Sequence, residues 1–266
     1  PCAPGPSDGV EVSAEIIDNS AVASAEIMYS VDGGAYQSAS MSVGADDVWT
    51  GTIPATGTDG ARVYYYISAT DDGIDQDEIK TSTFPYDTDV SQFGYVSKDG
   101  DLSIEDIQFT DWGSGDSPYD GCEVTVTGIV TADTAQYNSG YGAYAIQMDF
   151  SEWAGIIFDG WDDSELTRGD EVTITGTVEE YDPEWHFKYD NNTKLINISS
   201  VTVESTGNSM AATAVGTSDL AQDADEVESY EGGLVSIGNV TVSSVNSYDW
   251  SVVDGSGVEC LIDDDM

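Results

Sequence analysis

The sequence predicts an all-β chain of 266 residues with more than one module. Apolar and polar residues alternate in short runs such as Val10–Ile16, which is the pattern of a strand with one buried face. Clusters of Gly, Pro, Asn and Asp separate these runs and mark turns. An internal repeat is the third observation, because Tyr119-Asp120-Gly121 and the strand-like Val124-Thr125-Val126 return as Tyr230-Glu231-Gly232 and Val235-Ser236-Ile237.

The charge balance limits the partners of the chain. It has 51 Asp and Glu against 6 Lys and Arg, for a formal net charge of −45, so most carboxylates must be hydrated, screened or bound to cations. Such a surface repels phosphate and anionic lipid, which predicts no nucleic-acid partner. No run approaches the roughly 18 apolar residues of a membrane helix, which predicts no membrane insertion in this segment. The 15 Tyr, 6 Trp and 6 Phe favour a folded chain over a disordered one.

Residues 1–88 are predicted to form the first module. Besides the run at Val10–Ile16, strands are expected at Ala25–Val31, around Trp49–Ile53 and at Arg62–Ala69. Asp32-Gly33-Gly34 is a hairpin signal, because glycine adopts positive φ without steric cost.

Three stretches of this module carry a resemblance. Ser24–Tyr36, Trp49–Pro54 and Val63–Asp72 resemble the fibronectin type III and immunoglobulin-like sandwich modules of large secreted bacterial proteins. The resemblance extends from residue 4 to about 86, and it implies an adhesive or spacer role and no chemistry. Such modules begin with a strand before the Pro-rich corner, which here is Pro1–Pro6 at the start of the chain. The first edge strand is therefore expected to be missing or supplied from elsewhere.

Residues 89–100 are predicted to be a linker, and residues 101–205 a second module. Its five strands are expected at 122–131, 143–149, 154–159, 170–181 and 194–204. Gly128 and Gly176 lie within strands, where glycine marks a bulge or a tight bend. Five strands with a long, bent first strand predict a Greek-key barrel of the oligonucleotide/oligosaccharide-binding (OB) type.

A second resemblance supports this barrel. Ser117–Tyr119, Val124–Ala132, Gly140–Gln147, Gly155–Ile157 and Leu166–Tyr181 resemble the OB-fold modules that accompany extracellular nucleases and phosphatases in secreted bacterial proteins. Such modules also occur in surface proteins without an enzyme. The resemblance implies an extracellular accessory role. The catalytic residues of those enzymes have no counterpart here, so no catalytic residue and no enzyme activity are predicted.

Residues 206–266 are predicted to be an incomplete second OB-like domain. Its strands are expected at about 234–245, 249–254 and 257–263. Counterparts of the strands at 169–178 and 194–204 are absent, which would leave an open apolar edge. Either the chain continues beyond Met266 or another subunit supplies the missing strands.

An acidic loop is the candidate metal site. Its carboxylates are Asp71, Asp72, Asp75, Asp77 and Glu78. Carboxylate oxygens are the ligands that Ca²⁺ requires, although the spacing differs from that of an EF-hand. The alternative is a solvated acidic turn.

Two further kinds of site follow from short patterns. Asn191, Asn197 and Asn239 match the Asn-x-Ser/Thr acceptor pattern for glycosylation. The three cysteines form no metal-ligand pattern and are candidates for disulfide bonding; they are Cys2, Cys122 and Cys260. One disulfide with a leftover thiol, three free thiols and pairing between molecules all remain open. Trp153, Trp161, Trp185 and Tyr181 either stack on sugar rings or belong to a core.

The predicted function is that of a non-enzymatic structural or adhesive subunit, located outside the cell or on its surface. Copies of the chain would complete one another's missing strands and form a head-to-tail fibre. There are two alternatives. The chain could be an accessory segment of a larger secreted hydrolase, or a calcium-dependent carbohydrate-binding module with a glycan partner.

Overall fold

The computed structural model describes residues 2–19, 21–73, 79–112, 115–133, 143–159, 166–180, 192–221, 224, 227–247 and 249–263. The chain divides into two compact units. Unit 1 comprises Pro1–Gly100 and Thr110–Pro118, and unit 2 comprises Asp101–Phe109 and Tyr119–Met266. Both consist mainly of β-strands arranged in several sheets, as predicted.

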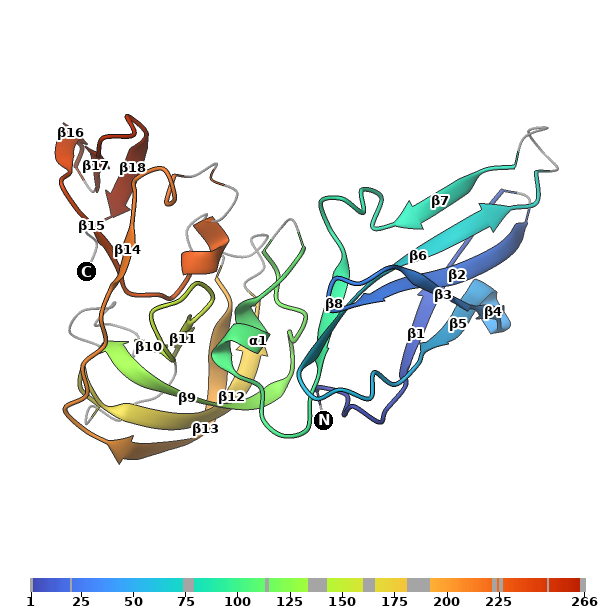
Figure 1. The fold of residues 1–266 in the computed structure, drawn as a ribbon, viewed down its shortest axis with the longest axis horizontal. Helices are drawn as coiled ribbons and strands as arrows, with labels where there is room; N and C mark the ends of the chain where they lie inside the picture. Colours follow the sequence, from blue (N-terminus) through green and yellow to red (C-terminus); the bar gives the residue numbers. More distant parts are fainter. Residues whose placement is uncertain are drawn as a thin grey trace. The chain divides into compact units, whose positions relative to one another are not determined.

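Unit 1 contains two sheets. Its strands are β1(Val10–Glu15), β2(Val22–Val31), β3(Gln37–Ser40), β4(Ser42–Val43), β5(Val48–Ile53), β6(Ala61–Asp71), β7(Thr81–Phe84) and β8(Phe93–Ser97), with a 3₁₀ turn at Ala45–Asp47. One sheet has the order β1-β5-β4. The other has the order β3-β2-β6-β7, and β8 also pairs with β6. The two sheets form two layers (Figure 1).

Both sheets contribute to one core. Val12 and Ile53 come from the first sheet, and Ile27, Val63 and Ile67 come from the second. Their positions follow the period-2 alternation of the sequence, which places every second residue on the same face. The predicted hairpin after β2 is confirmed, because Asp32 and Gly33 have φ values of 49° and 67°.

Strand β8 lies inside the segment 89–100, which the sequence predicted to be a linker. It pairs antiparallel with β6, from Ala61 opposite Ser97 to Tyr65 opposite Phe93. The ring of Phe93 stacks on Tyr65 with centroids 5.2 Å apart and contacts Trp112 at 5.1 Å. These aromatic contacts attach the segment to unit 1.

Unit 2 contains a five-stranded sheet that closes on itself. Its strands are β9(Glu123–Ala132), β10(Tyr144–Gln147), β11(Gly155–Phe158), β12(Glu171–Glu179) and β13(Lys194–Ser205). Each strand pairs with two neighbours in the order β10-β11-β13-β12-β9 and back to β10. The five strands lie where the sequence predicted them. The predicted irregularity at Gly176 is also present, since the register between β12 and β13 shifts there.

A short helix, α1(Ile104–Gln108), packs against the closed sheet. Ser103 and Asp106 cap it reciprocally, which satisfies backbone N–H groups at its first turn. Figure 1 shows α1 beside β11. Ile104 and Ile107 are buried, and the side-chain amide of Gln108 donates a hydrogen bond of 2.7 Å to the carbonyl of Gly155 in β11.

The rest of unit 2 contains the partial repeat. Its elements are β14(Thr213–Val215), the 3₁₀ turn η2(Val227–Tyr230), β15(Val235–Ile237), β16(Thr241–Val245), β17(Asp249–Val253) and β18(Glu259–Asp263). Strand β15 pairs in parallel with β14, and β16, β17 and β18 form an antiparallel sheet. The single strand expected at 234–245 is therefore two strands. The break coincides with Asn239, whose φ is 56° and does not fit an extended strand.

Candidate functional site

Strand β16 is the first candidate for an interaction edge. In the closed sheet, β9 pairs with β10 on one side and with β12 on the other. Strand β16 corresponds to the second half of β9 in the repeat, but among the described residues it pairs with β17 alone. All five of its residues are exposed, including Val242 at 49% and Val245 at 74%. The outer edge of β16 is thus open.

The apolar face of this sheet continues from its buried part to the exposed strand. The pairing register places Val242 opposite Val252 and Val252 opposite Cys260. Val252 and Cys260 are buried, and this burial raises the pKa of the Cys260 thiol. Because Val242 lies in the same row, β16 exposes the end of an apolar surface.

Strand β1 is the second open edge. Within the part of the chain that the structure describes, it pairs with β5 and with no second strand. Val12 points into the core, while Glu11, Ser13 and Glu15 are exposed. The two edges differ in charge, because β1 carries two glutamates and β16 contains only Thr, Val and Ser.

The predicted calcium loop is described in part. One carboxylate oxygen of Asp71 accepts hydrogen bonds from the backbone N–H groups of Gly73, at 3.0 Å, and Lys80, at 3.1 Å. Asp71 thereby joins the two ends of the connection between β6 and β7. Asp72 lies beside it and donates its backbone N–H to the carbonyl of Ala21.

The other predicted ligands, Asp75, Asp77 and Glu78, lie outside the described residues. The described residues contain no group of three His, Cys, Asp or Glu side chains with a metal-binding arrangement. The calcium site therefore stays a prediction.

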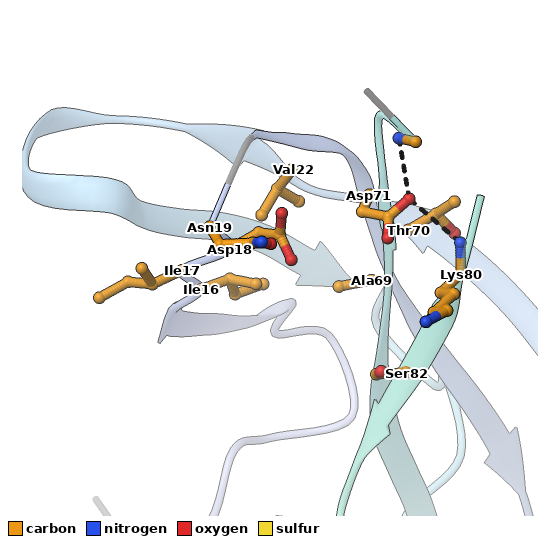
Figure 2. Close-up of a pocket in the computed structure, with 11 residues that line it drawn as sticks. Ile16, Ile17, Asp18, Asn19, Val22, Ala69, Thr70, Asp71, Lys80 and Ser82 are labelled. Carbon is orange, nitrogen blue, oxygen red and sulfur yellow. Dashed lines mark hydrogen bonds between the residues drawn. The ribbon is translucent and has the colours of Figure 1, made fainter. Parts of the chain in front are cut away.

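A pocket of about 190 Å³ lies next to Asp71 (Figure 2). Apolar side chains of Ile16, Ile17 and Val22 line one part of it, and the polar side chains of Asp71 and Lys80 line another. In Figure 2 the Asp71 carboxylate accepts the two backbone bonds described above. That carboxylate oxygen thus has a structural role in the loop.

The cysteines resolve into one disulfide and one thiol. Cys2 and Cys122 are disulfide-bonded, and Cys260 is a free, buried thiol. This outcome is one of the alternatives that the sequence left open. A disulfide indicates an oxidising compartment. Neither α1 nor the 3₁₀ turns of the described chain have the length and apolar character required of a membrane-spanning helix.

The remaining sequence candidates are exposed, partly buried or outside the described residues. Asn197 and Asn239 are exposed, whereas Asn191 is not described. Trp153 packs edge-on against Phe109 with ring centroids 5.5 Å apart. Trp161, Trp185 and Tyr181 lie outside the described residues. Glycosylation and a glycan partner stay predictions.

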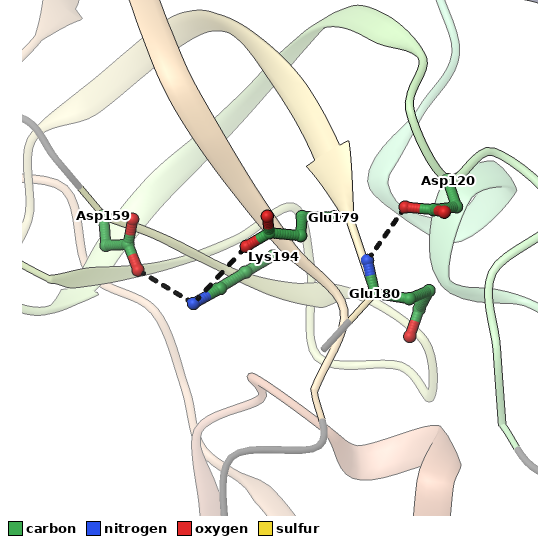
Figure 3. A network of polar contacts seen from close by, with 5 residues as sticks. All are labelled: Asp120, Asp159, Glu179, Glu180 and Lys194. Carbon is green, nitrogen blue, oxygen red and sulfur yellow. Dashed lines mark hydrogen bonds and ion pairs between the residues drawn. The ribbon is translucent and has the colours of Figure 1, made fainter. Parts of the chain in front are cut away.

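A polar network joins the strand ends of the closed sheet (Figure 3). The Lys194 ammonium lies 3.1 Å from the Asp159 carboxylate and 3.8 Å from that of Glu179. On the other side, the backbone N–H of Glu180 donates to Asp120 at 3.1 Å, and the Thr193 hydroxyl donates to the Glu180 carboxylate at 2.6 Å.

The sequence did not single out Glu231 as a functional residue. One of its carboxyl oxygens is buried without a hydrogen-bond partner. Burial, followed by the negative charges of Glu228 and Glu180, raises the pKa of Glu231 to about 9. Its place in the repeat corresponds to Asp120, which is exposed. The repeat was visible in the sequence, but burial at this position was not.

The chain matches no known family and no curated protein in sequence comparison. The structure defines a mostly β protein with several sheets, one of them a closed five-stranded sheet.

Proposed function

We propose that the chain is a non-enzymatic extracellular subunit that assembles with copies of itself by pairing strand edges. The observation that carries the proposal is the outer edge of β16, which is uncharged and has no partner strand among the described residues. In the first repeat the corresponding edge is occupied, because the N–H of Val130 donates to the carbonyl of Asp170 and the carbonyl of Val130 accepts from the N–H of Gly169. The occupant of the β16 edge is then an extended strand of another copy of the chain.

The fold supports this role at a finer level. The two sheets of unit 1 are consistent with an immunoglobulin-like sandwich in which β1 is an edge strand that pairs with β5 alone among the described residues. The closed sheet of unit 2 fits an OB-like barrel, and β15 to β18 fit a partial second copy of it. The Cys2–Cys122 disulfide and the acidic surface fit an extracellular location.

Charge favours pairing of β1 with β16 over pairing of like edges. Two β1 edges would bring Glu11 and Glu15 of one copy close to those of the other, and like charges on adjacent strands are destabilising. Two β16 edges would pair without that penalty but would leave β1 open. Pairing of β1 with β16 satisfies both edges. Because the two surfaces differ, the contact repeats head to tail and generates a fibre.

The net charge of −45 makes this assembly dependent on ions. Copies of the chain repel one another at low salt, and the screening length falls from about 30 Å at 0.01 M to about 3 Å at 1 M ionic strength. Assembly is therefore expected to increase with salt. Divalent cations such as Ca²⁺ are expected to act at lower concentrations than Na⁺, because they neutralise carboxylates directly.

Substitution of Val242 tests the proposal. Val242→Lys places a charge at the open edge of β16, whereas Val203→Lys introduces the same charge on β13 at a valine of similar exposure, 46%. In sedimentation velocity, the wild type and Val203→Lys are expected to form large species as salt rises, and Val242→Lys is expected to remain monomeric. Monomeric wild type at every salt concentration would contradict self-assembly. A wild type that forms dimers but no larger species would contradict the head-to-tail arrangement.

A further inference from the structure

The turn from Val227 to Gly233 attaches the C-terminal repeat to the closed sheet. The backbone N–H of Trp153 donates a hydrogen bond of 2.6 Å to the carbonyl of Ser229. The N–H of Leu234 donates one of 2.8 Å to the side chain of Gln147, which is itself buried in β10. Backbone and side-chain bonds thus hold the turn at both of its ends.

Two glycines bring the backbones together at the middle of this contact. A Cβ atom on Gly155 of β11 would lie 2.4 Å from the carbonyl carbon of Gly232, and a Cβ on Gly232 would lie 3.0 Å from that of Gly155. Only residues without side chains allow this approach. Glu231, which precedes Gly232, is therefore held close to the closed sheet.

The surroundings of Glu231 are negative. Glu228 of the same turn hydrogen-bonds its carboxyl group, Glu180 follows β12, and the backbone N–H of Thr193 donates to it before β13. Among the described residues, these two glutamates are the charged groups that act on it most strongly. The ammonium of Lys194, which follows Thr193, lies 3.1 Å from the Asp159 carboxylate and 3.8 Å from that of Glu179 (Figure 3).

A charged Glu231 would be poorly accommodated in this place. One carboxyl oxygen is buried and accepts no hydrogen bond. A buried carboxylate without a full set of donors loses hydration, and a second carboxylate beside it adds repulsion. A protonated carboxyl removes both penalties, because it is neutral and its O–H can donate to Glu228.

We propose that Glu231 docks as the neutral carboxylic acid, so that the turn Val227–Gly233 is a proton-dependent clasp between the closed sheet and the strands that follow it. The clasp does not depend on self-assembly of the chain. Its release would free β15 from its position and change how the open edge of β16 is presented.

The direction of the pH dependence follows from the raised pKa. The pKa of Glu231 is about 9 in the docked state and 4.5 for the free side chain, and burial is the largest cause. Docking therefore takes up a proton between these values. The contribution to stability is complete below about pH 4.5 and is lost as the pH rises through about 9. Within this window, the docking constant falls by up to about tenfold for each pH unit.

Hydrogen exchange of the full chain tests the clasp. The probe is the protection of the backbone amides from Val227 to Ile237 between pH 5 and 9, corrected for the intrinsic rate at each pH. Protection in the wild type is expected to fall with rising pH. Glu231→Gln removes the titrating group, so its protection is expected to be nearly constant and to exceed that of the wild type at pH 8. Asp120→Asn removes the corresponding charge in the first repeat and is expected to retain the wild-type slope.

An infrared measurement gives an independent readout in the unaltered protein. At pH 7 the wild type is expected to show the carbonyl band of a protonated carboxylic acid, and this band is expected to disappear as the pH rises through about 9. Absence of the band at pH 7 would overturn the proposal. A wild-type slope that persists in Glu231→Gln would also overturn it. Loss of protection on addition of a chelator at pH 7 would do the same, because a bound cation would then be neutralising the cluster.

Discussion

The closed sheet and the C-terminal sheet of unit 2 begin with related sequences but differ in the burial of their first strands. Val130 in β9 lies opposite Ile146 and is 1% exposed, while Val242 in β16 lies opposite Val252 and is 49% exposed. The side chains are the same, and the strands have the same order. The difference lies in the neighbours, because the backbone of Val130 exchanges hydrogen bonds with Gly169 and Asp170 on its other side, whereas β16 pairs with β17 alone among the described residues. The same side chain is thus buried in β9, which is flanked on both sides, and exposed in β16.

The same comparison explains the two acidic residues at the start of each repeat. Asp120 is exposed and accepts the backbone N–H of Glu180. Glu231 is held against the closed sheet and has a raised pKa. The opening turn of the second repeat therefore contacts the closed sheet. The opening turn of the first repeat makes no corresponding contact with the second among the hydrogen bonds described above.

The largest expected effect is a difference in stability between truncation of an apolar side chain in the closed sheet and in the C-terminal sheet. Ile146→Ala removes a fully buried side chain of the closed sheet and is expected to lower the free energy of unfolding by about 2–5 kcal/mol. Leu261→Ala in β18 removes a side chain that is 60% exposed, and the expected change is within about 0.5 kcal/mol. Urea unfolding of dilute protein at low salt measures both. Equal losses would mean that the C-terminal sheet is covered even in the monomer.

An intermediate effect is expected at the contact between the repeats. Gly155→Ala would place a Cβ atom 2.4 Å from the backbone of Gly232, so the turn must shift, at a cost of about 1–3 kcal/mol. Gly255→Ala is the matched control, because no atom lies within 4 Å of a Cβ built there. Thermal unfolding compares the two variants. A Gly155→Ala protein as stable as Gly255→Ala would show that the turn is not docked in solution.

The smallest expected effect concerns the tie between Asp254 and the segment before the clasp. Hydrogen bonds from Ser256 and from Thr217 hold the pKa of the Asp254 carboxyl below its usual range. Because the folded pKa is lowered, these bonds contribute stability above about pH 4 and are lost as the pH falls further. Exchange of the amides from Gly255 to Val258 is expected to accelerate on acidification in the wild type. In Asp254→Asn this pH dependence should be absent, and its persistence there would assign it to another group.

Much of the strand arrangement could be predicted from alternation, because a half-buried strand needs an apolar residue at every second position. The strands around Ile27 and Ile174 follow this rule. Gly176 could be predicted as an irregularity, because glycine within a strand marks a bulge or bend. In the structure a Cβ there would lie 2.7 Å from the side chain of Ile198. Strand β8 was not predicted, because its attachment depends on the contact of Phe93 with Tyr65 and Trp112, which are distant in sequence.

The candidate sites were less predictable. The open edge of β16 could be inferred because the first repeat shows which strands a complete sheet contains. The division of the expected strand 234–245 into β15 and β16 at Asn239 could not be predicted, since asparagine also occurs within strands. Burial of the Glu231 carboxyl could not be predicted either, because glutamate is usually exposed. The close approach of Gly155 to Gly232, which holds the turn against the closed sheet, is visible only in the folded structure.

The most direct test of the central claim is cross-linking of the two open edges. In a Cys260→Ser background, Ser13→Cys marks β1 and Ser244→Cys marks β16, and both positions are exposed. With a short bismaleimide at high salt, the double variant is expected to give a ladder of covalent oligomers on a denaturing gel. A mixture of the two single variants is expected to stop at dimers. Absence of the ladder, or efficient dimerisation of the Ser244→Cys variant alone, would contradict head-to-tail pairing of β1 with β16.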